Sequence, residues 1–263
     1  MKMILNSCNV CTDSHRPRLT TLPFQANFTS AFIQRLFMSA YNPLLVVHKG
    51  LRALLFDTGR LLQQCDLAND ADCNVATERI SYVITVFERH TQNRDQYVLP
   101  AVAPHEPAVL SYFPADQQEN KAPITQLRCA LKVFRTSMPD TSDINSPRNL
   151  AKAFFQFTAF HLQRMEVEEQ VISPLLWLHH TQTNLLRLTL RIVQALSLEH
   201  TAPFDKWMVM GLNNSELVTW VKEVRQSASL PLFENLLSVA EAELPPGRWN
   251  QICEALLEGA LIA

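Results

Sequence analysis

Apolar residues recur every three or four positions along most of the chain, the spacing that places side chains on one face of a helix. The first such segment begins at Asn42-Pro43, where asparagine can cap a helix and proline fits its first position, and it runs to about Cys65. Further helices are predicted over about 71–103, 115–137, Ser146-Pro147 to Trp177, 180–198, 201–212, 214–227, 230–243 and 247–260. Because the alternating pattern of strands never replaces this period, the sequence predicts an all-α fold.

Polar residues interrupt four of these apolar faces. They are His48 on the first face, His90 and Arg94 on the second, Asn120 on the third, and His161, Arg164 and Glu168 on the fourth. A buried polar group without a partner costs up to several kcal/mol. The interruptions therefore predict one shared polar layer in the core, where side chains from different helices satisfy one another. Helical bundles build their metal and cofactor sites in such layers.

Composition narrows the class of protein. The chain has 263 residues, 47% of them hydrophobic and only 5 of them glycine, so it can bury a large core but has few residues suited to tight turns between strands. A net charge of −2 argues against nucleic acid as a partner, because nucleic-acid binding needs a basic surface. No window approaches the roughly 18 consecutive apolar residues of a membrane span, and no export signal opens the sequence. We therefore expect a cytoplasmic protein without membrane partners.

Residues 1–28 lack a helical period and are expected to form an N-terminal arm, followed by a short helix from Thr29. Within the arm, Cys8 and Cys11, with His15, are spaced like half of a zinc site. Two thiolates and one imidazole leave a tetrahedral site one ligand short, and no second pair of this spacing occurs. We therefore expect free thiols and no tightly bound zinc in the arm.

Three segments carry a family resemblance when they are taken together. They read VVHKGLRALL, FERHTQNRDQYVLPAV and FTAFHLQRMEVEEQVISPLLW. In order and spacing they resemble the first, second and fourth helices of the hemerythrin-like (HHE cation-binding) domain family, in its larger bacterial members. The resemblance covers about residues 30–260 and implies an antiparallel four-helix bundle over 29–178. It also implies a C-terminal helical extension over 179–263, packed on the bundle.

The resemblance implies a set of iron ligands, of which this chain keeps a part. By position, His48 and His90 match iron-binding histidines of the family, and Glu168 and Glu169 keep its acidic pair. His161 is a candidate for a displaced ligand. A working site would bind non-haem iron through His48, His90, His161 and Glu168.

Three positions depart from the family's pattern. Arg94 stands where a bridging glutamate is expected, Arg164 where a histidine is expected, and Asn120 where the third helix should supply a histidine. Because arginine carries a fixed positive charge that repels a nearby dication, we expect Arg94 and Arg164 to replace metal charge in the core. Their expected partners are Glu168, Glu169 and Asp95.

Three functions stay open at this point. The first is a protein without a cofactor, whose eroded di-iron site binds a small molecule or a protein partner through Arg94, Asn120, Arg164 and Glu169. The second is a working non-haem iron protein for O2 or nitric oxide. The third is a structural scaffold whose polar layer sets the register of its helices. The sequence contains no dinucleotide-binding, P-loop, zinc-protease or serine-hydrolase motif, which favours a protein that is not an enzyme.

Overall fold

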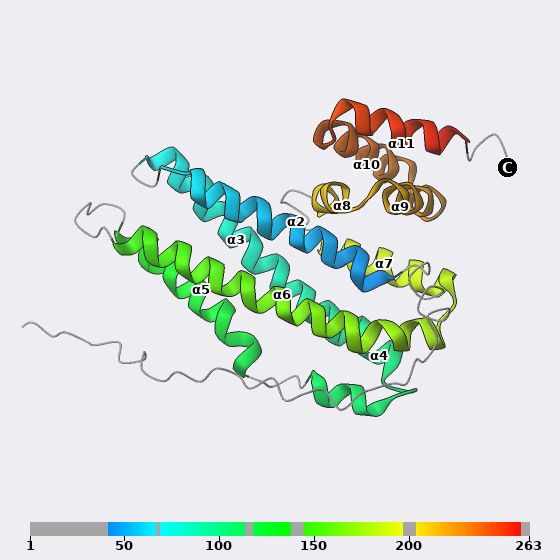
Figure 1. The fold of residues 1–263 in the computed structure, drawn as a ribbon, viewed down its shortest axis with the longest axis horizontal. Coiled ribbons are helices and arrows are strands. Elements are labelled where there is room, and N and C mark those ends of the chain that lie inside the picture. Colours follow the sequence, from blue (N-terminus) through cyan, green and yellow to red (C-terminus); the bar gives the residue numbers. More distant parts are fainter. Residues whose placement is uncertain (1–41, 67–68, 114–117, 138–144, 197–203, 259–263) are drawn as a thin grey trace, which may run out of the picture. The chain divides into compact units, whose positions relative to one another are not determined.

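A computed structural model describes residues 42–66, 69–113, 118–137, 145–196 and 204–258. These residues belong to one compact unit, Ala40–Ala263. Every regular element within them is a helix, so the all-α prediction is confirmed (Figure 1). The expected arm with Cys8 and Cys11, and the helix expected from Thr29, lie outside the described residues.

Four long helices surround the core. They are α2 (Pro43–Gln64), α3 (Asp70–Asn93), α5 (Gln118–Ser137) and α6 (Asn145–His179). Both α2 and α5 contact α3 and α6, so the four lie side by side (Figure 1). Their fully buried large side chains include Leu51, Phe87, Leu127, Phe154 and Phe157. Burial of each such side chain contributes about 1.5–3 kcal/mol, which makes these contacts the main stabilisation of the four helices.

The start of α2 follows from its local sequence. The Asn42 side chain accepts hydrogen bonds from the amides of Leu44 and Leu45, and Pro43 occupies the first position of the helix. Asn42 also donates from Nδ2 to Ser173 Oγ on α6, over 3.1 Å in a buried environment. This second bond holds the beginning of α2 against α6, close to His48 on one helix and to Glu168 on the other.

The helix expected over 71–103 is present without a gap from Asp70 to Val102, but its hydrogen-bond pattern changes along its length. It divides into α3, a π-helical turn η1 (Arg94–Val98) and the short α4 (Leu99–Val102). Pro100 explains the change, because proline has no amide to donate to the carbonyl four residues earlier in an α-helix. The wider turn begins at Arg94, immediately after the helix that carries His90. Turns of this kind often occur at functional sites.

The remaining helices belong to the same compact unit. They are η2 (Pro107–Tyr112), α7 (Gln182–Leu196), α8 (Asp205–Gly211), α9 (Asn214–Ser227), α10 (Leu230–Glu243) and α11 (Pro246–Glu258). α7 contacts α2 and α3, α8 packs along α2, and α10 contacts α8, α9 and α11. A Cβ atom on Gly211 would clash with the Lys49 carbonyl, so glycine allows the close approach of α8 to α2. Among the helices described, none combines the length and the apolar character needed to cross a bilayer.

Candidate functional site

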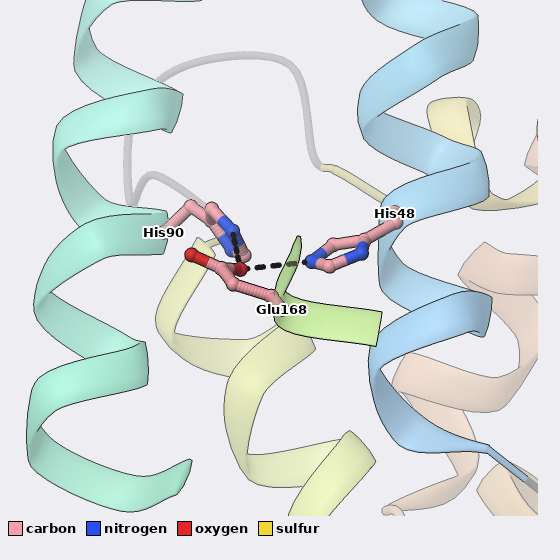
Figure 2. Close-up of side chains that lie close together, drawn as sticks. All are labelled: His48, His90 and Glu168. Carbon is pink, nitrogen blue, oxygen red and sulfur yellow. Dashed lines mark hydrogen bonds and ion pairs between the residues drawn. The ribbon is translucent and has the colours of Figure 1, made fainter. Parts of the chain in front are cut away.

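Glu168 of α6 is the centre of the polar layer. It is only 1% exposed, and its Oε2 atom lies 3.3 Å from His48 Nε2 and 3.2 Å from His90 Nε2. The two imidazole rings come from α2 and α3, and their centroids are 5.1 Å apart in an edge-to-face arrangement. Figure 2 shows both rings pointing at the same carboxylate oxygen. Three helices that are distant in sequence thus each contribute one side chain to a common point.

The other oxygen of Glu168 faces an arginine. Arg94 is 3% exposed, and its Nη1 donates to Glu168 Oε1 over 3.1 Å. The Nε and Nη2 atoms of Arg94 lie 2.8 and 2.7 Å from Asp95 Oδ1, so each of the three guanidinium nitrogens has a carboxylate partner. Burial favours the neutral form of Glu168, but the adjacent imidazoles of His48 and His90 outweigh burial and hold the pKa of this carboxyl well below its usual range.

A second carboxylate orients His48. Its Nδ1 lies 2.7 Å from Glu169 Oε1, and Arg52 donates to the same oxygen from Nη2 over 2.7 Å. With Nδ1–H donating to Glu169, Nε2 faces Glu168 but is not aligned with it as a hydrogen bond. Burial opposes protonation of His48, yet Glu168 and Glu169 together raise its pKa above the ordinary value. The arrangement therefore favours a cation between His48 and Glu168, either a proton on Nε2 or a metal ion.

His90 differs from His48 in charge although it touches the same carboxylate. Burial lowers the pKa of His90, and the hydrogen bond and charge of Glu168 do not compensate for it. His90 is therefore the neutral partner, and its Nε2–H donates to Glu168 over 3.2 Å.

Arg164 approaches the cluster from the preceding turn of α6 and is incompletely paired. Its Nε lies 3.7 Å from Glu168 Oε1, and its Nη1 reaches the Tyr112 carbonyl only at 3.5 Å. The Nε and Nη2 atoms are buried and have no hydrogen-bond partner among the residues that the structure describes. The guanidinium carbon lies 4.6 Å from the centroid of the Phe113 ring, and that of Arg94 lies 5.4 Å from it. Burial, with a further contribution from Arg94, lowers the pKa of Arg164, so its surroundings compensate its charge poorly.

His161 stays outside the charged cluster. Its ring centroid lies 4.5 Å from that of Phe87 and 4.3 Å from that of Phe157, and the residue is 4% exposed. Burial, reinforced by His90, lowers the pKa of His161 to about 3, so the ring is neutral. Its nitrogens are not among the ligand atoms that converge on Glu168. Asn120, the candidate of the third helix, lies in α5, and its side chain falls outside the described residues.

The cluster has the donor set of a site for one divalent metal ion. In the part of the chain that the structure describes, one group of potential ligand atoms converges, those of His48, His90 and Glu168, all within 4.8 Å of one another. Ligand atoms bound to one ion at about 2.1 Å lie about 3 Å apart, which suits the two separations from Glu168. A carboxylate on the far nitrogen of a ligating histidine, as Glu169 is on His48, is typical of such sites. The residues fit two ions poorly, because Arg94 occupies the remaining oxygen of Glu168.

Two contributors to the site were not among the predicted residues. Arg52 lies one turn after His48 on the same helix face, a spacing that in principle indicates a shared partner. The guanidinium groups of Arg94 and Arg164 both lie over the ring of Phe113. Phe113 follows a short helix that the apolar period did not predict. No local signal in the sequence points to its role.

The chain has no match among protein-family models, among curated proteins or among solved structures. The resemblance of three segments to the hemerythrin-like family therefore stays a prediction. The proposals that follow rest on the geometry of the described residues.

Proposed function

We propose that the protein is a hemerythrin-like helical-bundle protein whose di-iron site is eroded, and that it binds a small ligand without catalysing a reaction. In this proposal α2, α3, α5 and α6 are the four helices of the bundle. A network of arginine, carboxylate and histidine side chains takes the place of the metal ions, and the same network recognises the ligand.

The observation that carries the proposal is the contact between Arg94 and Glu168. Arg94 is nearly inaccessible to solvent and donates to Glu168 at 3.1 Å, on the oxygen that does not face the histidines. A guanidinium keeps its charge at all physiological pH values and can hold carboxylate oxygens in fixed positions. It therefore supplies permanently the positive charge that a metal ion would supply on binding.

Charge balance favours this arrangement over a two-metal centre. At an effective dielectric of about 20, a guanidinium about 5 Å from a dication is repelled by about 7 kcal/mol. Arg94 and Arg164 both lie beside Glu168, so each would add such a term for an ion placed there. The repulsion would be still larger for two ions.

A second candidate function is the binding of one divalent metal ion. It is favoured by the convergence of His48, His90 and Glu168, and by the lack of an aligned hydrogen bond at His48 Nε2. When bound, such an ion would supply an exchangeable position for O2 or nitric oxide. His48 and His90 would hold it as neutral imidazoles, and Glu168 as the single carboxylate.

Elemental analysis of the purified full chain, prepared from iron-supplemented medium, tests the proposal. We expect iron, manganese and zinc well below one ion per chain, and an unfolding temperature that EDTA leaves unchanged. One ion per chain that is lost in His90→Gln would establish the second candidate and overturn the first. Two ions per chain would overturn both candidates.

A pair of substitutions tests the same idea in the opposite direction. Arg94→Glu together with Arg164→His restores the two residue types that the family places at these positions. We expect this double variant to gain iron and near-ultraviolet charge-transfer absorption relative to the parent chain. The matched control is Arg164→His alone, which should gain neither, because Arg94 still occupies the oxygen of Glu168.

A further inference from the structure

We propose that the unpaired edge of Arg164 binds one small, planar monoanion that presents two oxygen atoms side by side, of the formate or nitrite kind. This inference rests on the proposed function, since it names the class of small ligand that the site without metal would take. Its support comes from contacts around Arg164 that the described residues leave incomplete.

The first support is the shape of the unpaired edge. The Nε–H and one Nη2–H of a guanidinium point in the same direction and form a fork that matches two oxygens of a carboxylate. In Arg94 this fork is engaged by Asp95, at 2.8 and 2.7 Å. In Arg164 the same two atoms are buried, and no described residue forms a hydrogen bond with them. Unsatisfied buried donors of a charged group are costly, so a ligand that accepts both hydrogen bonds would be stabilised there.

The second support is that each nearby carboxylate is already held by another arginine at shorter range. Asp95 lies 2.7 Å from Arg94, Glu168 lies 3.1 Å from Arg94, and Glu169 lies 2.7 Å from Arg52. Within the described ranges, the carboxylate paired with Arg164 is Glu168, and their separation of 3.7 Å exceeds hydrogen-bond distance. The three carboxylates equal the three guanidinium groups in number, but two of them lie against Arg94, so the charge of Arg164 is offset only at the longer range of 3.7 Å.

The third support is the crowding of two like charges on one ring. Arg94 and Arg164 both place their guanidinium carbons over Phe113, at 5.4 and 4.6 Å from its centroid. The ring face attracts each cation, but the two cations repel one another. An anion on the free edge of Arg164 would offset that repulsion.

The surroundings also limit which anions fit. The Arg164 side chain is 17% exposed and that of Arg94 only 3%, so Arg164 is the closer of the two to solvent. Its two unpaired nitrogens are themselves buried, so a ligand would have to displace the side chains that cover them. Glu168 is ionised close to the free edge and would repel a dianion more strongly than a monoanion. The site should therefore prefer formate to sulfate or hydrogen phosphate.

Titration of the full chain, freed of metal with EDTA and dialysed, tests the inference. Sodium formate is the probe, and sodium sulfate holds the ionic strength constant. We expect saturable heat of binding by calorimetry, and a saturable shift of one arginine Nε–H signal in the nitrogen–proton spectrum. That signal should be absent from the spectrum of Arg164→Lys.

The variant Arg164→Lys keeps the charge but removes the fork. Loss of one charge-assisted hydrogen bond should weaken formate binding about tenfold or more. The matched control is Arg128→Lys, which alters an exposed arginine of α5 and should bind formate like the parent. If Arg164→Lys does not fold, assignment of the shifted Nε–H signal to Arg164 in the parent by its contacts with Phe113 decides the question.

Three results would overturn the inference. They are the absence of saturable formate binding in the parent, equal binding in Arg164→Lys, and a shift confined to other arginines. Any of these in protein that elemental analysis finds free of metal would mean that water alone fills the edge, and would leave the proposed function standing. Formate binding that appears only when a metal ion is present would instead contradict the proposed function as well.

Discussion

Two polar positions of α6, two helical turns apart, have opposite environments. Glu168 receives two imidazoles and a guanidinium from other helices and stays ionised although it is buried. His161 receives phenylalanine rings and stays neutral. Both residues interrupt the same apolar face of the helix, so the sequence presents them as equivalent. The comparison teaches that the charge of a buried group is decided by the partners that other helices bring to it.

The largest loss of stability should come from removing the buried ion pair at Glu168. Arg94→Met leaves Glu168 without its guanidinium, and removal of one member of a buried ion pair costs about 3–5 kcal/mol. The free energy of unfolding in urea, measured at neutral pH, checks this. Arg128→Met is the matched control, because it breaks an exposed pair with Glu88 and should cost at most about 1 kcal/mol.

A double-mutant cycle separates the ion pair from simple loss of packing. Glu168→Gln should cost less in the Arg94→Met background than in the parent chain, because the charge it removes no longer has its partner. Equal costs in the two backgrounds would mean that Arg94 and Glu168 do not interact in solution. The assignment of Arg94 as a replacement for metal charge would then fail.

Because His161 is held neutral among aromatic rings, it should make the stability of the folded chain sensitive to acid. The pKa of His161 is about 3 in the folded chain, against 6.5 as the ordinary value, so the unfolded chain takes up a proton at higher pH than the folded chain does. Stability should therefore fall as the pH falls below 6.5, by about 2 kcal/mol between pH 8 and pH 5 from this group alone. His161→Phe, which suits the aromatic surroundings, should lose that part of the dependence.

Urea unfolding of parent and variant at several pH values measures this difference. Leu162→Met, a substitution beside His161 that removes no titratable group, is the control and should keep the slope of the parent. A His161→Phe variant with the acid sensitivity of the parent would show that His161 is accessible to protons in the folded chain.

The smallest effect on stability should arise at His48. Its pH dependence should be opposite to that of His161, because stability is lost as the pH rises. Burial opposes the charge that Glu168 and Glu169 favour, and the net result is a raised pKa of His48 in the folded chain. The stabilisation is therefore complete below pH 6.5 and is lost as the pH rises through the folded-state pKa. Chelator-treated parent should lose stability in this alkaline window, whereas His48→Gln should show a flatter profile, with His105→Gln as the control. A profile of His48→Gln that is as steep as the parent's would assign the titration to another group.

Much of the fold follows from local patterns. The expected helix over 230–243 coincides with α10, and the expected start at Asn42-Pro43 is the start of α2 with its predicted cap. The expected helix over 71–103 matches an unbroken helical run from Asp70 to Val102, but the period of apolar residues did not reveal the π-turn within it, which precedes Pro100. Local patterns thus located the helices, but they did not show where a turn widens without a change of period.

The candidate site was predictable in part. His48, His90 and Glu168 were recognised as polar interruptions of apolar faces, and the structure brings these three together. His161 looked the same by that criterion and lies instead among aromatic rings. Phe157 precedes His161 by one turn on the same face of α6, but Phe87 belongs to α3, and only the tertiary structure brings its ring to His161.

The sequence alone determined where the helices lie and which of their faces are buried, because both depend on contacts between residues three or four positions apart. The tertiary structure alone decided which partner each polar side chain meets. His48 meets Glu169 across 121 positions of the chain, and Arg94 meets Glu168 across 74. The charge state and orientation of a core side chain depend on its distances in space to such partners. Electrostatic interactions weaken steeply over a few ångströms, and no local pattern encodes these distances. The unpaired edge of Arg164 is of this second kind, since it is defined by partners that other residues already hold.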